Sequence, residues 1–192
     1  MDRALAEELL AMAAEDLRVR ERLAADGSLF QGYHPQMRAV HERHADRLTG
    51  IIAERGWPEP GLVGEEAAHA AWLVAQHAIS RPALMRQALA MLVETSGAPN
   101  PQTAQLEDRI RLFEGREQRF GTQFDWDERG EINPCPIEEQ DKVDWYRAGA
   151  GLPPLAQAIA EHRARSGSKP GPTDLAARRR AAEAFAGEVG WR

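Results

Sequence analysis

Three histidines carry the residue chemistry best suited to proton transfer or metal binding in this 192-residue chain. His41 and His44 are one helical turn apart, and both fall on the apolar face that the spacing of their neighbours predicts. His77 follows Gln76 at the end of an alanine-rich segment. Because an imidazole exchanges protons near neutral pH and also binds metals, these residues indicate acid–base chemistry or a metal site.

Two acidic residues could assist the histidines. Asp16 lies on the apolar face of the first predicted helix, where a lone charge is costly to bury. An ion pair with Arg20, four residues further on, is the ordinary explanation, and a place in a polar pocket is the alternative. Asp108 precedes Arg109 in another predicted helix. The pair is either an ordinary surface pair or part of the site, where Arg109 would bind a carboxylate or phosphate.

We expect these residues to form one site from separate segments of the chain. His77 is the predicted general acid or base, His41 a second proton carrier or orienting group, and Asp108 the carboxylate that fixes the tautomer of His77. The predicted substrate contacts are Tyr33, Trp72, Gln76, Arg109, Thr122 and Gln123.

A divalent metal is the alternative, although the sequence implies no particular cofactor. Glu66 and His69 have the Glu-x-x-His spacing of helical di-iron sites, but such a site needs two segments of this kind. A zinc- or nickel-type site needs about three inward ligands. The candidate ligands are Asp16, His41, His44 and His77.

The elements that must position these residues are mainly helices. Apolar residues recur at helical spacing over residues 3–25, from Pro35 to Ile52, in the alanine-rich segment that ends at His77, and over residues 83–94 and 102–113. Two further helices are expected at residues 141–147 and 152–165. We expect an all-α domain of five to seven helices over residues 1–165, with a small β-hairpin near 120–133. Residues 166–173 read as a linker, and residues 174–192 as a detachable C-terminal amphipathic helix.

Composition narrows the classes of partner. The chain carries 24 basic and 30 acidic residues, and the basic ones are interleaved with acidic ones, which argues against nucleic-acid binding. The single cysteine, Cys135, excludes an internal disulfide. No apolar run is long enough to span a membrane, and the N-terminus does not resemble a signal peptide. We expect a cytoplasmic monomer or homodimer with no membrane partner.

Several spaced motifs carry a family resemblance. The segments GYHPQM, GWP, VGEEA, AWLVAQHA, LEDRI and EQRFGTQF occur in this order. Together they resemble a widespread bacterial family of unknown function marked by QHA, DR and (Y/F)GTQ segments, over most of residues 5–155. In that family a tyrosine usually stands where this chain has Phe120. The resemblance implies that Gln76-His77, Asp108-Arg109 and residues 121–123 belong to one functional unit, and it implies no reaction.

The leading hypothesis is a small cytoplasmic bacterial enzyme that uses histidine-centred acid–base chemistry. Its substrate would be a polar small molecule or peptide, and hydrolysis, elimination and epimerisation all remain open. The first alternative is a metal-dependent helical-bundle enzyme with His, Asp and Glu ligands. The second is a non-catalytic ligand- or protein-binding module, which would expose an aromatic patch. That patch would contain Trp57, Trp72, Phe124 and Trp126.

Overall fold

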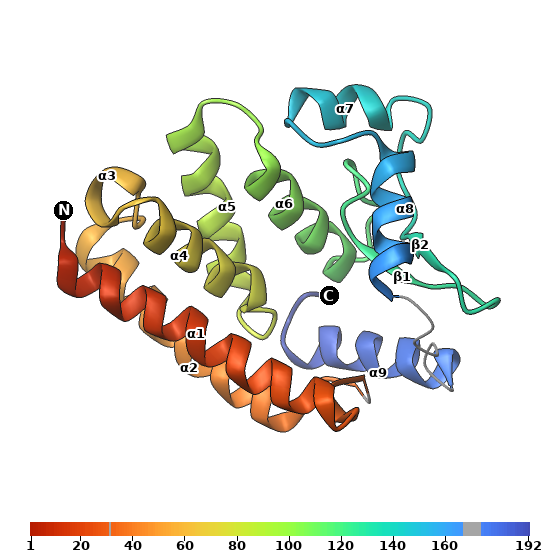
Figure 1. The fold of residues 1–192 in the computed structure, drawn as a ribbon, viewed down its shortest axis with the longest axis horizontal. Helices are drawn as coiled ribbons and strands as arrows, with labels where there is room; N and C mark the ends of the chain where they lie inside the picture. The colour runs from red at the N-terminus through yellow and green to blue at the C-terminus, as the bar shows by residue number, and fades with distance from the viewer. Residues whose placement is uncertain (31, 167–173) are drawn as a thin grey trace. The chain divides into compact units, whose positions relative to one another are not determined.

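The computed structural model describes residues 1–30, 32–166 and 174–192. Helices make up 68% of the structure, and the described residues also form one small two-stranded antiparallel sheet (Figure 1). The prediction of a mostly α-helical fold is therefore confirmed. No helix in the described ranges has both the length and the apolar character needed to cross a membrane.

The elements agree closely with the helical periodicity of the sequence. In chain order they are α1 (Arg3–Ala25), α2 (Pro35–Arg55), α3 (Pro60–Val63), α4 (Glu65–His77), α5 (Pro82–Ser96), α6 (Pro101–Phe113), β1 (Phe124–Trp126), β2 (Ile132–Pro134), α7 (Val143–Gly149), α8 (Leu155–Ser166) and α9 (Leu175–Glu188), with a short 3-10 helix at Ser28–Phe30. Among the described residues, the helices α1 to α8 precede the C-terminal tail, which is one more than the upper limit of the expected five to seven. The additional helix is α3, which is a single turn. The predicted linker overlaps the end of α8 at residue 166, and its residues 167–173 lie outside the described ranges.

Contacts divide the chain into two units, which are described separately. The N-terminal unit comprises Met1–Met91 and the C-terminal unit Leu92–Arg192, so the division falls within α5.

In the N-terminal unit, α1 packs against α2, α3 and α4 (Figure 1). Ion pairs connect α1 and its N-cap residue to α2. As the residue number increases along α1, that of its partner on α2 decreases, as in an antiparallel pair of helices. These pairs are Asp2–Arg55, Glu8–Arg47 and Glu15–Arg43. Exposed ion pairs contribute little stability, so the apolar seam beneath them holds the helices together. Fully buried side chains of these two helices include Leu9, Met37, Leu48 and Ile51.

In the C-terminal unit, the predicted hairpin is present as β1 and β2, with Trp126 opposite Ile132. The side chain of Asp127 closes its turn by accepting hydrogen bonds from the backbone N–H groups of Arg129 and Glu131. Helix α8 packs against β2, and α7 packs against α8. An isolated hairpin is marginal in water, and this packing provides the support it needs.

The C-terminal helix α9 is attached to its unit by aromatic contacts. Trp191, just beyond α9, stacks on Phe113 at the end of α6, and Phe185 meets the same ring edge-on. Arg178 pairs with Asp125 of the hairpin. Whether α9 detaches in solution stays a prediction.

Candidate functional site

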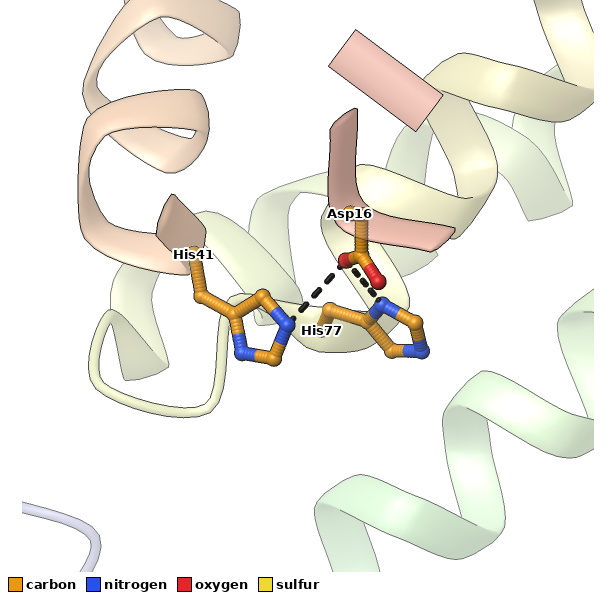
Figure 2. A group of neighbouring side chains, drawn as sticks. All are labelled: Asp16, His41 and His77. Atoms are coloured by element: carbon orange, nitrogen blue, oxygen red, sulfur yellow. Dashed lines mark hydrogen bonds and ion pairs between the residues drawn. The ribbon is translucent and has the colours of Figure 1, made fainter. Parts of the chain in front are cut away.

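Three helices of the N-terminal unit bring one carboxylate and two imidazoles together. Asp16 comes from the middle of α1, His41 from α2 and His77 from the last turn of α4 (Figure 2). We call this group the Asp16 cluster. The apolar stripes of the three helices pack together, and the cluster lies where a polar residue interrupts each of them.

One oxygen of Asp16 contacts both rings. Its Oδ2 lies 2.6 Å from Nδ1 of His77 and 3.1 Å from Nε2 of His41 (Figure 2). The two rings are tilted with their centroids 5.0 Å apart. Asp16 thus contacts imidazoles from two other helices, which the expected pairing with Arg20 does not include.

Burial distinguishes the members of the cluster. The exposed fraction of the side chain is 6% for Asp16 and 8% for His41, but 17% for His77. Burial alone would raise the pKa of Asp16, but the contacts with His41 and His77 outweigh it and hold that pKa well below its usual value. The cluster is therefore a buried carboxylate with one partly accessible imidazole.

Tyr33 extends the cluster on the far side of His41. Its hydroxyl lies 2.8 Å from Nδ1 of His41, and the two rings stack with centroids 5.7 Å apart. Burial and the nearby charge of Glu42 raise the pKa of Tyr33 above its usual value, so its hydroxyl stays protonated. Tyr33, His41, Asp16 and His77 form a continuous polar chain.

The other predicted site residues gather in the C-terminal unit. Asp108 is fully buried, and its two oxygens accept hydrogen bonds from backbone N–H groups of Arg119, Phe120 and Thr122 and from the Thr122 hydroxyl. Its carboxylate thus orders the loop that carries the GTQ segment. The carboxylate that contacts His77 is that of Asp16.

Arg109 and Gln123 also meet in this unit. Nε of Arg109 donates to Oε1 of Gln123 over 3.2 Å, and the Gln123 amide lies 3.2 Å from the Thr122 hydroxyl. The structure therefore groups Asp108, Arg109, Thr122 and Gln123 with one another, and His41, His77 and Tyr33 with Asp16. One site formed by both groups stays a prediction.

A model of a protein family of unknown function, DUF6624, matches residues 3–169. The chain belongs to this family. The DUF6624 match covers the Asp16 cluster and the three segments on which the sequence resemblance rests, and it ends before α9. No curated protein and no solved structure matches the chain.

Other candidates within the DUF6624 match lie apart from the Asp16 cluster. Nε2 of His44 lies 3.0 Å from Glu15, and burial lowers the pKa of His44 more than Glu15 raises it. Glu66 and His69, the Glu-x-x-His pair, have exposed side chains. Of the four candidate metal ligands, the structure brings together Asp16, His41 and His77.

Two of the predicted substrate contacts lie in α4. Gln76 is buried immediately before His77 in the chain. Trp72 is also buried, and its ring lies 5.0 Å from that of His69. The contacts shown for Trp72 make it a packing residue of α4, and a contact with substrate stays a prediction.

Sequence reasoning did not single out two buried polar residues of the C-terminal unit. The Gln118 amide donates to the carbonyls of Gln123 and Cys135, and Arg147 donates to the carbonyls of Phe120 and Gly121. Both residues satisfy backbone groups of an irregular loop, which would otherwise be costly to bury. No spacing or motif in the sequence marks such a role, because the partners are main-chain atoms of distant residues.

Proposed function

We propose that this chain is a small enzyme in which His77 acts as the general acid or base and Asp16 orients it. The observation that carries the proposal is the 2.6 Å contact between Nδ1 of His77 and a buried, ionised carboxylate. Such a contact holds the proton on Nδ1 and directs Nε2 to exchange protons with a substrate. His77 is also the most exposed member of the cluster.

The remaining members support the same chemistry. The Asp16 charge stabilises the imidazolium that forms when His77 accepts a proton. His41, between Asp16 and Tyr33, can carry a second proton or hold Asp16 in place. Proton transfer by a positioned side chain contributes about 10²- to 10⁴-fold to a rate. Hydrolysis, elimination and epimerisation of a polar small molecule or peptide all use such a group.

Substrate recognition is a separate part of the proposal. Arg109, Thr122 and Gln123 offer a cation, a hydroxyl and an amide within one hydrogen-bonded group of the C-terminal unit. These groups suit a carboxylate or phosphate on the substrate. Their recognition of the substrate of His77 stays a prediction.

Isotope incorporation tests the proposal without a known substrate. The purified chain is incubated with pools of dipeptides and polar metabolites in D₂O or H₂¹⁸O, and products are analysed by mass spectrometry. Epimerisation and reversible proton abstraction introduce deuterium into recovered substrate, whereas hydrolysis introduces ¹⁸O into the product. We expect wild-type protein to introduce label, and His77→Ala to do so at least about a hundredfold more slowly.

The matched control is His69→Ala, which removes an exposed imidazole from the same helix. It should label at the wild-type rate, and all variants should keep circular dichroism spectra typical of the folded protein. Labelling by His77→Ala at the wild-type rate would refute the proposal. So would a wild-type protein that introduces no label in any pool.

A metal-dependent enzyme is the second candidate, with the same cluster as the donor set. The observation in its favour is that one donor atom from each of Asp16, His41 and His77 lies within 4.8 Å of the others. A bound ion would supply a Lewis acid that polarises a substrate oxygen.

A non-catalytic binding module receives no support from the aromatic residues that would have marked it. Trp57 and Trp72 are buried. Phe124 and Trp126 are half-buried, with Phe124 stacked on His162 and Arg178 over the ring of Trp126. These four side chains are therefore engaged in packing within their units.

A further inference from the structure

We infer that Asp16, His41 and His77 bind one divalent transition-metal ion, for which zinc is the best match. The inference deepens the metal-dependent candidate and concerns only the binding of the ion. An ion on Nδ1 of His77 would replace the proton that the metal-free proposal places on that atom. It rests on the convergence of three donor atoms and on a buried nitrogen that the protein itself leaves unsatisfied.

The unsatisfied atom is Nε2 of His41. It is inaccessible to solvent and makes no hydrogen bond within the described residues, although Oδ2 of Asp16 is only 3.1 Å away. At that distance a hydrogen bond fails only when the N–H direction points away from the acceptor. Buried polar atoms nearly always have a partner, so an unsatisfied nitrogen beside a carboxylate needs an explanation.

The two tautomers of His41 explain why Nε2 has no hydrogen-bond partner. If Tyr33 donates to Nδ1, then Nε2 carries a proton that is poorly aimed at Asp16. If Nδ1 instead donates to the Tyr33 oxygen, Nε2 carries a lone pair in the same direction, close to a carboxylate oxygen with which it cannot form a hydrogen bond. A cation bound to both Nε2 and Oδ2, to one side of the line that joins them, accepts both lone pairs and satisfies Nε2. Tyr33 then fixes the metal-binding tautomer, as partners of metal-bound histidines commonly do.

The spacing of the donors suits such an ion after a small adjustment. Zinc lies about 2.0–2.1 Å from nitrogen and oxygen ligands, so donors at the corners of a tetrahedron are about 3.3 Å apart. Nε2 of His41 is already 3.1 Å from Oδ2 of Asp16. Nδ1 of His77, at 2.6 Å, must move outward, and the partly exposed ring of His77 is the one best placed to do so.

The donor types determine the class of ion. Two imidazoles and one carboxylate suit zinc and its first-row neighbours, whereas calcium and magnesium require mainly oxygen ligands. Three protein ligands leave one position open, as in catalytic zinc sites. His44 is outside this set, because its Nε2 lies on Glu15.

Isothermal titration with ZnCl₂ tests the inference. Wild-type protein without a histidine tag is first dialysed against a chelator and then against metal-free buffer. We expect one zinc per chain, with binding weakened at least a hundredfold in His41→Gln and in Asp16→Asn. Tyr33→Phe, which keeps every ligand, should weaken binding about tenfold because the tautomer is no longer fixed. The controls His44→Gln and His69→Gln should bind like wild type.

Two further readouts keep the test decisive if a ligand variant fails to fold. X-ray absorption of the zinc-loaded wild type should show two imidazoles in the first shell, and ZnCl₂ but not MgCl₂ should raise its thermal midpoint. No saturable binding, a first shell without imidazole, or binding lost in His69→Gln but retained in His41→Gln would each overturn the inference. Because none of these readouts uses turnover, the metal site and the proposed function can fail separately.

Discussion

At the scale of single residues, Asp16 occupies a position where a charge is costly to bury. It is a charge almost completely enclosed among helices, and its stability there depends on two imidazoles that share one of its oxygens. Removing a partner from a buried charge costs more than the pair contributes, because the remaining group stays desolvated. The three residues should therefore behave as a coupled group.

Replacing Asp16 tests this coupling. Asp16→Asn removes the charge while keeping the size of the side chain, and we expect unfolding in urea at pH 7 to cost about 1–3 kcal/mol less than in wild type. The matched control is Glu7→Gln, an exposed acid on the same helix, which should change stability by less than about 0.5 kcal/mol. Equal stability of Asp16→Asn and wild type would show that the carboxylate carries no structural charge interaction.

His44 gives a prediction for pH. Because burial lowers its pKa, the unfolded chain binds the proton more readily than the folded one. Stability should therefore be complete above the unfolded pKa of about 6.5 and decrease as the pH falls through the lower folded value. His44→Gln keeps a donor for Glu15 and should lose less stability between pH 7 and pH 5, measured by urea unfolding in chelator. A His69→Gln profile steeper or flatter than wild type would count against this assignment.

Residue patterns predicted part of this site. The helical spacing correctly placed His41 and His44 on a buried face and marked Asp16 as a charge needing a partner. It did not predict that His77, 61 residues away, is that partner. Periodicity identifies the buried face of each helix. Which residue of another helix lies against Asp16 depends on how the three helices pack.

Among the elements, the ends of α2 and α6 are marked by nearby residues in the sequence. The conformation of the loop before β1 depends on side chains distant in the sequence. Proline in the first turn opens α2 and α6, and Gly56, at φ +77°, ends α2. The loop before β1 has no such code, since buried side chains of Asp108, Gln118 and Arg147 determine its path. For this reason the helix bounds could be predicted from the sequence, whereas the conformation of the GTQ loop could not.

Gly121 of that loop has a backbone conformation and close neighbours that disfavour a side chain. Its φ is +63°, and a Cβ atom there would lie 3.0 Å from the side chains of both Ile137 and Leu155. We expect Gly121→Ala to lower the free energy of unfolding by about 2 kcal/mol or more, from backbone strain and overpacking together. Gly149→Ala, in α7 with open space around its Cβ, should be neutral or slightly stabilising. Chemical denaturation followed by circular dichroism compares the two, and equal losses would contradict the packing argument.

For the whole molecule, the sequence predicts one helical domain followed by a linker and a tail, and these bounds stay a prediction. Contacts divide the chain into two units within α5. No change of composition marks that point, because α5 is a continuous helix. The family match ends at residue 169, yet α9 and the residues after it contact α6 through Phe113. Arg192 also donates to the Phe113 carbonyl, and a cation is favourable at this end of a helix.

These contacts predict that the C-terminal tail stabilises its unit. Trp191 is 4% exposed and stacked on Phe113, so Trp191→Ala should destabilise the C-terminal unit by about 3 kcal/mol and increase amide hydrogen exchange throughout α9. Trp145→Ala is the matched control, because this tryptophan of α7 is 73% exposed and should contribute less than about 0.5 kcal/mol. If α9 already exchanges as fast as an unfolded peptide in wild type, the helix is detached in solution and its aromatic contacts are not stable. Slow exchange that Trp191→Ala abolishes and Trp145→Ala preserves would instead identify the tail as part of the fold.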